Sequence, residues 1–431
     1  MSSIIETKSE PRFASAYVGS PTTPTLQCRS CGRERPEAVL DLGVQPLSNR
    51  YLAASQLRDM EPHYPLTLCV CDGCGLAQID AVERPEQIFT PEYAYFSSYA
   101  QSWLAHARTY AERMVQERGL NQKSFVLEVA SNDGYLLRWF AQEQIRVLGV
   151  EPAVACAQAA KAYGVPSECA FFGIETATRL VQAHGRADLM VANNVLAHVP
   201  NINDFVGGFA CALAPTGLAT FEFPHLLRLV EGNAWDTIYH EHFSYLSLSA
   251  LQPVFARHGL QIVDVEQLPT HGGSLRLFVV PAGAAVVQKR VEELVAQEQQ
   301  AGITRHEGYA RFTNQVRASQ GALYEYLLAQ RRAGKRVVAY GAAAKGNTLL
   351  NSCGIHQDLI EYVVDRNPHK VGLLMPGSHL PIRAVEDLEN DTPDTVLILP
   401  WNLADEIMAS MQHLRDRGVT FAAPIPMIRE L

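Results

Sequence analysis

The sequence predicts an α/β protein in which two Rossmann-like domains follow a small cysteine-rich module. Two stretches carry this prediction, because residues 125–137 and 337–348 each run from an apolar strand through a short turn into a helical pattern. That order of elements opens a doubly wound sheet. The third observation is a pair of Cys-x-x-Cys motifs near the N-terminus. At 431 residues the chain is long enough for two or three domains.

Shifts in composition divide the chain into four segments. Residues 1–25 are rich in Ser, Thr and Pro and lack the basic start and apolar core of a signal peptide, which indicates a flexible tail. Residues 26–80 hold the paired cysteine motifs, and residues 81–282 hold the first α/β pattern. Residues 283–431 begin with a connector rich in Glu, Gln, Arg and Leu and end with the second α/β pattern. We expect the connector to form one or two amphipathic, solvated helices.

The charge balance and the cysteine usage argue against several classes of protein. The formal net charge is −9, whereas nucleic-acid-binding proteins usually present a basic face. No run of about 18 apolar residues is present, so we expect no membrane span. Nine cysteines, several of them single in apolar stretches, fit a reducing cytoplasm better than a disulfide framework. We therefore expect a cytoplasmic protein that binds neither nucleic acid nor membrane.

The two Cys-x-x-Cys motifs predict a structural zinc site. They consist of Cys28 with Cys31 and Cys71 with Cys74, and each is followed by a glycine that tolerates a tight turn. Four thiolates fill a tetrahedral site and leave no position for water, so the metal would be structural. Cys69 is a poorer ligand because only one residue separates it from Cys71. The alternative interpretations are a redox pair of thiols and a nucleic-acid-binding ribbon.

The turn after the first predicted strand suits an adenosine ligand that carries positive charge. A pyrophosphate would need glycines here, whereas Ala130, Ser131 and Asn132 stand in their place. Glu128 at the strand end would repel phosphate but suits the ammonium and sulfonium groups of S-adenosylmethionine. An acid at the tip of the second strand can accept hydrogen bonds from both ribose hydroxyls. The expected residues around S-adenosylmethionine are Glu128, Ala130, Asn132, Gly134, Glu151, Phe172 and Asn193.

Four anchors together resemble the sugar C-methyltransferases of deoxysugar biosynthesis, over nearly the whole chain after the tail. They are the cysteine module, the turn 128–134, the string Tyr239-His240-Glu241-His242-Phe243 and the string Tyr340-Gly341-Ala342-Ala343-Ala344-Lys345. The resemblance implies a zinc-binding module, a central methyl-donor domain and a C-terminal Rossmann-like domain that grips a nucleotide sugar. It also implies C-methylation beside a ketone, usually at C3 of a thymidine-diphosphate-linked 4-keto-6-deoxyhexose. Ala130 is a departure, because glycine is commoner there in the family.

The resemblance also implies the catalytic residues. His242 is the expected base, since an imidazole with a pKa of about 6.5 can remove a proton beside a ketone near neutral pH. Glu241 would orient that ring or contact the sugar. His198 and one of three tyrosines, Tyr93, Tyr95 and Tyr239, are the expected donors to the ketone oxygen. Packed histidines and core aromatic residues are the plainer interpretation of the same positions.

The second α/β pattern offers a phosphate site. Small residues at 341–344 leave backbone N–H groups open at a helix start, and Lys345 adds a cation. On spacing alone this turn could bind NAD, coenzyme A or nothing, and the resemblance favours a nucleoside-diphosphate sugar. We expect Lys345 and Asn347 near the diphosphate, with Trp401 and Asn402 as further contacts. The small polar loop 271–274 could also face the sugar.

Two other functions fit the same motifs. An O- or N-methyltransferase would use His242 to deprotonate a hydroxyl or an amine instead of a carbon. A non-catalytic zinc-containing protein that binds nucleotides would need no base, although it would keep the cysteine motifs and the second α/β pattern.

Overall fold

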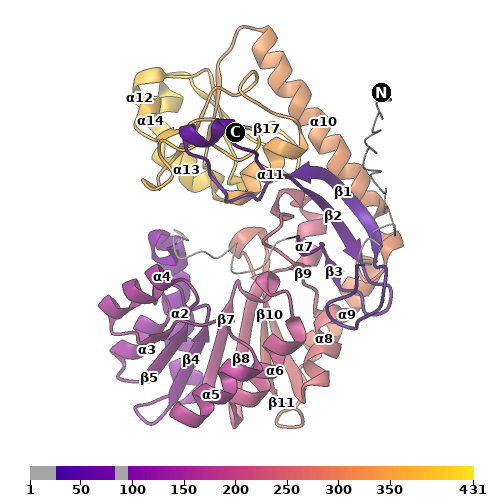
Figure 1. The fold of residues 1–431 in the computed structure, drawn as a ribbon, viewed down its shortest axis with the longest axis vertical. Helices are drawn as coiled ribbons and strands as arrows, with labels where there is room; N and C mark the ends of the chain where they lie inside the picture. The colour runs from indigo at the N-terminus through magenta and orange to yellow at the C-terminus, as the bar shows by residue number, and fades with distance from the viewer. Residues whose placement is uncertain (1–25, 83–95) are drawn as a thin grey trace, which may run out of the picture.

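The structure is a computed structural model that describes residues 26–82 and 96–431, and these residues form three sheets (Figure 1). The predicted tail 1–25 and the predicted catalytic tyrosines Tyr93 and Tyr95 lie outside the described residues. The largest sheet and the C-terminal sheet lie at opposite ends of the molecule, and the N-terminal module runs along the side of both (Figure 1).

The largest sheet has the strand order β10-β11-β8-β7-β4-β5-β6. The strands from β4 to β8 are parallel, while β11 and β10 are added antiparallel at one edge. The chain order reverses between β4 and β7, which is where open α/β sheets bind their ligands. The strands are β4 (Phe125–Val129), β5 (Arg146–Val150), β6 (Ser167–Glu168), β7 (Ala187–Asn193), β8 (Leu213–Pro224), β10 (Leu260–Leu268) and β11 (Ser274–Pro281).

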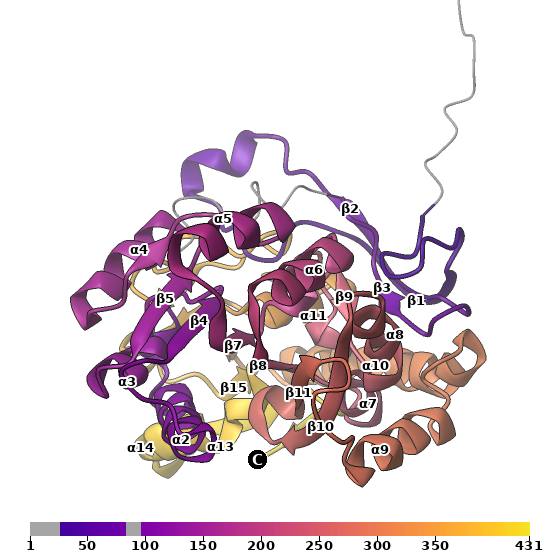
Figure 2. The ribbon, with the colours of Figure 1, turned by 90° about the horizontal axis from the view of Figure 1, so that it is seen from below.

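Helices cover both faces of this sheet because successive strand residues point to opposite sides. Val126 packs with residues of α2 and α3, whereas Leu127 packs with residues of α5 and α6, and Figure 2 shows the two pairs on opposite faces. The helices are α2 (Gln101–Arg118), α3 (Leu137–Gln142), α4 (Val154–Ala160), α5 (Ile174–His184), α6 (Ile202–Ala212), α7 (Leu226–Glu231) and α8 (Leu248–Arg257). Short 3-10 helices are η2 (Ser97–Tyr99), η3 (Lys161–Tyr163), η4 (Leu196–His198), η5 (Trp235–Thr237) and η6 (Thr270–Gly272).

The C-terminal sheet has the order β14-β13-β12-β15-β16-β17 and is parallel except for β17. Its order reverses between β12 and β15, so the turn after β12 lies at a second ligand-binding edge. The strands are β12 (Val337–Tyr340), β13 (Val363–Asp365), β14 (Ile382–Ala384), β15 (Thr395–Ile398), β16 (Thr420–Ala423) and β17 (Arg429–Glu430). The helices are α11 (Ala344–Ser352), η8 (Trp401–Leu403), α12 (Asp387–Asp391), α13 (Ala404–Ser410) and α14 (Gln412–Asp416).

The N-terminal module shares its sheet with the first α/β domain. The order of this sheet is β1-β2-β3-β9, and all of its pairings are antiparallel. Three of the strands come from the module, whereas β9 directly follows the string Tyr239–Phe243 in the sequence. The elements are β1 (Glu37–Gln45), η1 (Ala54–Arg58), β2 (Tyr64–Val70), β3 (Ala77–Gln78) and β9 (Ser244–Tyr245).

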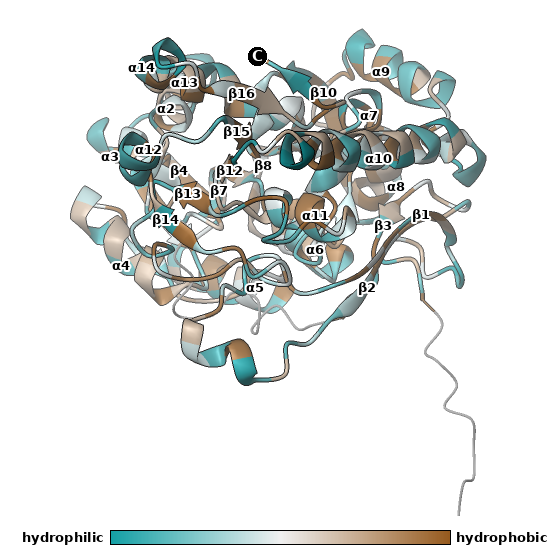
Figure 3. Cartoon of the chain, turned by 90° about the horizontal axis from the view of Figure 1, so that it is seen from above, coloured by the Kyte–Doolittle hydropathy of each residue, from teal (hydrophilic) through white to brown (hydrophobic). Residues whose placement is uncertain are grey.

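The connector is two helices, α9 (Lys289–Gln300) and α10 (Ala310–Arg332), with η7 (His306–Tyr309) between them. The expectation of a solvated connector is wrong for their inner faces, because Phe312 and Val316 of α10 and Leu294 of α9 are buried. Figure 3 shows the hydrophilic residues of both helices as teal bands beside brown apolar ones. In the described part of the chain, no helix combines the length and the apolar character that crossing a bilayer requires.

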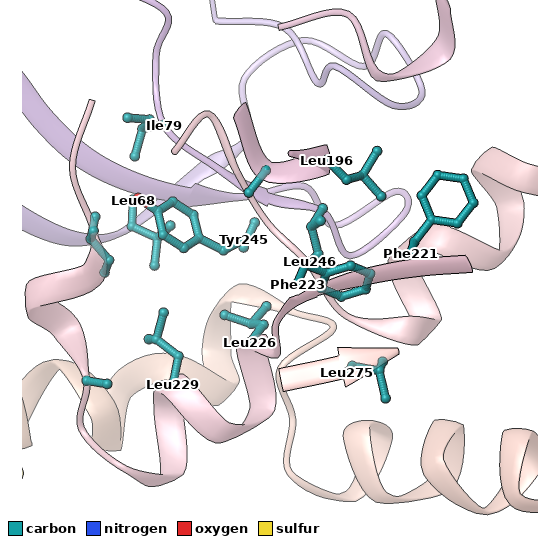
Figure 4. Close-up of a cluster of buried hydrophobic side chains, with 14 of the residues drawn as sticks. Leu68, Ile79, Leu196, Phe221, Phe223, Leu226, Leu229, Tyr245, Leu246 and Leu275 are labelled. Carbon is teal, nitrogen blue, oxygen red and sulfur yellow. The ribbon is translucent and has the colours of Figure 1, made fainter. Parts of the chain in front are cut away.

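The main core continues from the N-terminal module into the first α/β domain. Leu68 of β2 and Ile79 after β3 lie near Tyr245 of β9 and Leu226 of α7 (Figure 4), and all four side chains are buried. Burial of a large aliphatic side chain contributes roughly 1.5–3 kcal/mol. The module is therefore packed onto the α/β domain and is not a separate domain joined only by a linker.

A buried carboxylate fixes α9 to this core. Glu298 is fully buried, and its oxygens accept from His225 Nε2 at 2.7 Å, from the N–H groups of Leu248 and Ser249, and from the Ser249 hydroxyl. Leu248 and Ser249 are the first residues of α8, so Glu298 caps that helix from α9. The charge-rich composition of the connector therefore did not indicate that one of its carboxylates, Glu298, is buried.

Replacement of Glu298 by Ala should destabilise the protein strongly. The change leaves the imidazole of His225 and the N–H groups that begin α8 without their acceptor, and loss of one partner of a buried pair costs about 3–5 kcal/mol. The measurement is the midpoint of urea unfolding. Glu293→Ala is the matched control, because Glu293 lies on the same helix in an exposed ion pair with Lys289. Equal midpoints for the two variants would contradict the role of Glu298.

Candidate active site and metal centre

The four predicted cysteines form one cluster. The Sγ atoms of Cys28 and Cys74 are 3.4 Å apart, those of Cys31 and Cys71 are 3.6 Å apart, and all four lie within 4.8 Å of one another. A tetrahedral zinc with Zn–S bonds of about 2.3 Å places its sulfurs about 3.8 Å apart, so the cluster fits this ion. Cys69 lies outside the cluster, and burial raises the pKa of its thiol to about 11. The site is closed by thiolates, as a structural site requires.

The first cysteine knuckle is bound to the α/β domain. Arg257 donates to the carbonyl and the hydroxyl of Ser30, and Asn203 donates to the carbonyls of Arg29 and Ser30 at 3.0 Å. Arg29 in turn donates to the carbonyl of Phe243 at 3.0 Å. The module therefore holds the end of the string Tyr239–Phe243 through both the knuckle and the β3–β9 pairing.

A cavity of about 560 Å³ opens between the module and the two α/β domains. Its wall includes residues from all three parts, such as Asn49, Ala130 and Ala343. Ten of the residues predicted from the sequence line it: Ala130, Asn132, Glu151, Phe172, Asn193, His198, Tyr239, Glu241, His242 and Lys345. Five others lie outside its wall: Glu128, Gly134, Asn347, Trp401 and Asn402.

One end of the cavity is built by the turn after β4. The N–H groups of Asn132 and Ala153 donate to the two carboxylate oxygens of Glu151, at 3.0 Å and 2.8 Å. Burial raises the pKa of Glu151, while these two hydrogen bonds lower it. Ala130 has a φ of 58°, in the left-handed region that favours glycine. Glycine adopts this conformation without a steric penalty, which explains why it would fit at the position where this chain carries alanine.

Two predicted donor-site residues have other surroundings. Glu128 is fully buried, and burial raises its pKa well above the usual range of a carboxyl, so it presents no exposed carboxylate to the cavity. Gly134 has a φ of 76°, and a Cβ there would lie 3.2 Å from the side chains of Ala160 and Val165. Its small size thus serves the packing of the turn against the end of α4. Strand position does not reveal which way a side chain points, so a contact of Glu128 with the methyl donor stays a prediction.

An aromatic wall that the sequence did not reveal flanks this end. Trp103 of α2 stacks on Tyr135, with ring centroids 5.8 Å apart, and lies 5.2 Å from the ring of His271. All three residues line the cavity. The loop 271–274, noted as a small polar loop, therefore places its histidine at the site, whereas nothing in the sequence distinguished Trp103 from a core aromatic residue.

Hydrogen bonds fix the tautomer of His242. Its Nδ1 lies 2.8 Å from the carbonyl oxygen of Thr237, which can only accept, so Nδ1 carries the proton. Its Nε2 lies 2.9 Å from the hydroxyl of Tyr239 and is left as an acceptor. Burial lowers the pKa of His242 well below its usual range, and the nearby His198 lowers it further. The ring is therefore neutral near pH 7, and Thr237, not Glu241, orients it.

His198 is held in the same way. Its Nδ1 lies 2.8 Å from the carbonyl oxygen of Glu241, and its ring meets that of His242 with centroids 4.7 Å apart. Burial lowers its pKa to about 4. The neutral ring then carries its proton at Nδ1 and has an acceptor at Nε2. This arrangement speaks against the expected role of His198 as a donor to a ketone oxygen, because that role would need a proton at Nε2.

The opposite end of the cavity is basic. Lys345 donates to Asn402 Oδ1 and lies 5.1 Å from the ring of Trp401, which donates to Asp236 at 2.8 Å. Trp401 and Asn402 therefore hold Lys345 and do not line the cavity themselves. Asn347 is buried within α11. Lys370 is a second lysine in the wall that the sequence did not single out, since it follows β13 within a run of polar residues.

Comparison with known proteins covers the same three parts. Residues 28–89 match a family described as a putative zinc binding domain, residues 103–265 a methyltransferase domain, and residues 269–426 a C-methyltransferase C-terminal domain. The C-methyltransferase NovU of Streptomyces niveus is 35% identical over 404 residues, which is 94% of this chain and 96% of that protein. This chain belongs to the C-methyltransferase family.

The C-methyltransferase uses S-adenosylmethionine and carries a zinc-binding module, so the predicted fold class and cofactors are confirmed. Family membership also excludes the alternative of a non-catalytic nucleotide-binding protein. It favours transfer of the methyl group to carbon over transfer to oxygen or nitrogen. Two solved methyltransferases are similar to part of this chain at low sequence identity. A 1,6-didemethyltoxoflavin-N1-methyltransferase of Burkholderia thailandensis is 16% identical, with a TM-score of 0.36 over 48% of this chain and 95% of that one. Magnesium protoporphyrin IX methyltransferase of Synechocystis is 16% identical, with a TM-score of 0.33 over 42% and 83%.

Cys71→Ser should release most of the zinc from the C-methyltransferase and lower its melting temperature, because binding of a structural metal is coupled to folding. The measurements are metal content by mass spectrometry and thermal unfolding. Cys69→Ser is the matched control, since its thiol lies on the same strand end but outside the cluster. Zinc retained in Cys71→Ser at the level of the control would contradict the assigned ligand set.

Proposed function

We propose that this C-methyltransferase methylates a carbon beside the ketone of a nucleoside-diphosphate sugar, at C3 of a 4-keto-deoxysugar. One observation carries the proposal: a single cavity is lined by the turn after β4, by the His242 motif and by Lys345 at the start of α11. A methyl donor, a base and a cation for a diphosphate can therefore reach one substrate. The resemblance to sugar C-methyltransferases supports thymidine diphosphate as the nucleotide.

The base in this reaction is His242. A hydrogen beside a ketone is acidic because its removal leaves an enolate, yet a positioned base is still required. Nε2 of His242 is unprotonated and accepts from the Tyr239 hydroxyl at the cavity wall, so it can take the proton from C3 once that hydroxyl turns toward the substrate. The Thr237 carbonyl stabilises the imidazolium that forms by accepting from Nδ1. S-adenosylmethionine, when bound, supplies the electrophilic methyl group.

Tyr239 serves the developing oxyanion. Its hydroxyl is 2.9 Å from His242 Nε2, which places a neutral donor beside the base. When the substrate binds, the phenol turns its proton from Nε2 to the ketone oxygen, and the Nε2 lone pair then receives the proton from C3. A positioned donor of this kind often contributes about 3 kcal/mol to the barrier reduction. This assignment replaces His198, whose tautomer presents an acceptor.

The two lysines and the helix start hold the diphosphate. Ala343 and Ala344 line the cavity at the N-terminal end of α11, where free N–H groups and the helix dipole favour an anion. Lys345 and Lys370 line the same end and contribute positive charge. Burial lowers the pKa of both lysines. An incoming diphosphate would favour their charged forms and raise that pKa again.

His242→Asn should abolish enolisation but leave the donor pocket intact. Incubated with a nucleoside-diphosphate 4-keto-deoxysugar and S-adenosylhomocysteine in deuterated water, the wild type should exchange the C3 hydrogen. The variant should lose exchange and turnover by about 10²- to 10⁴-fold, as expected for removal of a general base. Binding of S-adenosylhomocysteine, measured by calorimetry, should not change.

His356→Asn is the matched control, because His356 is exposed and lies outside the cavity wall. Its exchange rate should equal that of the wild type. Exchange at the wild-type rate in His242→Asn would refute the base. A product that lacks a new methyl group on carbon in its NMR spectrum would refute the proposed reaction itself.

A further inference from the structure

Asn49 is a residue of the N-terminal module that reaches the active site. It lies in the segment between the two cysteine knuckles, between β1 and η1, and it lines the cavity. Its side-chain Nδ2 donates a short hydrogen bond to Oε2 of Glu241. The zinc-binding module therefore does more than support the string Tyr239–Phe243 from outside, because it contributes a side chain that contacts the carboxylate of that string.

The amide of Asn49 is held from its other side. The Tyr51 hydroxyl lies 3.3 Å from Asn49 Oδ1 and donates to the carbonyl of Ala342 at 2.6 Å. Lys370 donates to the same carbonyl at 2.7 Å and lies 5.0 Å from the Tyr51 ring. Since a hydroxyl faces Oδ1 and a carboxylate faces Nδ2, the orientation of the amide is set by its partners. A chain of contacts thus joins the turn after β12 to Glu241.

Glu241 sits between opposing influences. It is buried, and burial outweighs the hydrogen bonds from Asn49 and the charge of Lys370, which lower its pKa, so that the pKa is raised to about 7. Three other titratable groups around it, His198, His242 and Tyr51, are close to neutral at pH 7, because burial lowers the pKa of both histidines and raises that of Tyr51 well above its usual range. The contacts that favour the carboxylate are therefore those from Asn49 and from the charge of Lys370.

We propose that Asn49 is a positioning residue that fixes the Glu241 carboxylate in the cavity as an acceptor for a substrate hydroxyl. This inference rests on the proposed function, because it assigns Glu241 a contact with the sugar. Asn49 donates to the carboxylate from its side chain and its backbone, and the two oxygens of a carboxylate offer about four acceptor positions, so Glu241 can still accept from a substrate hydroxyl. Protonated Glu241 would instead present a hydroxyl, and a hydrogen bond to the sugar would lose its charge assistance.

The pH profile of Asn49→Ala separates this role from a structural one. Loss of the donor raises the pKa of Glu241, so the carboxylate forms only at higher pH. The acidic limb of kcat/KM should then move up by about one pH unit, as expected for loss of a hydrogen bond to a charged group. Activity should fall about five-fold near pH 7 and approach the wild-type level near pH 9. Asn49→Asp should shift the limb further, because a second carboxylate repels the first.

Tyr51→Phe gives a second, milder variant, since it keeps the buried ring and removes only the hydroxyl that braces the amide. Its acidic limb should move in the same direction by less. Arg50→Ala is the matched control, because Arg50 is adjacent in the sequence and exposed. A loss of activity in Asn49→Ala that is equal at every pH, with unshifted limbs in both variants, would overturn the proposal.

A substrate-free measurement distinguishes this inference from the proposed function. Carbon-13 NMR of the Glu241 carboxyl gives its pKa in the wild type and in Asn49→Ala without any turnover. A higher pKa in the variant, together with a shifted profile, supports the inference. An unchanged pKa overturns it even if the wild type methylates the sugar. If the wild type fails to methylate any nucleotide keto-sugar, the proposed function fails, whatever the carboxyl titration shows.

Discussion

The structure depends on a short antiparallel pairing between β3 of the N-terminal module and β9 of the methyltransferase domain. Ala77 pairs with Tyr245 and Gln78 with Ser244, so the string that carries His242 ends inside the module's sheet. A two-residue strand has little stability of its own, because isolated strand pairs are marginal in water. The zinc cluster and the buried core around Leu68 hold β3 in place, and through it the string is held too.

Burial sets the charges of the site. His198 and His242 each donate a hydrogen bond from Nδ1–H to a backbone carbonyl oxygen, and burial lowers the pKa of both rings. A neutral imidazole with a fixed tautomer is ready to accept a proton, whereas a solvated one would be partly charged near pH 6.5. Glu241 shows the opposite shift for the same reason. Low dielectric surroundings thus suit a site in which charge moves from carbon to oxygen.

Patterns local in the sequence predicted the elements and the metal ligands well. The strand at Phe125–Val129 and the cysteine spacing follow from periodicity and ligand geometry, which need no tertiary information. Asn49 and Lys370 were missed because the sheet of the module and the second α/β domain bring them to the cavity from distant parts of the chain. The burial of Glu128 was not foreseen, since the pattern predicts a strand but not the depth of its side chains. The charge-rich composition of the connector likewise gave no indication that the Glu298 side chain lies in the core.

The dependence of the catalytic string on the zinc-binding module can be tested by hydrogen exchange, followed by mass spectrometry, in the zinc-loaded protein and after removal of zinc by a chelator. If the module orders the catalytic string, peptides that contain residues 239–245 should lose protection together with residues 77–78. Peptides from β4 and β7 should keep their protection, because those strands lie within the large sheet. Undiminished protection of residues 239–245 in the metal-free protein would contradict the account.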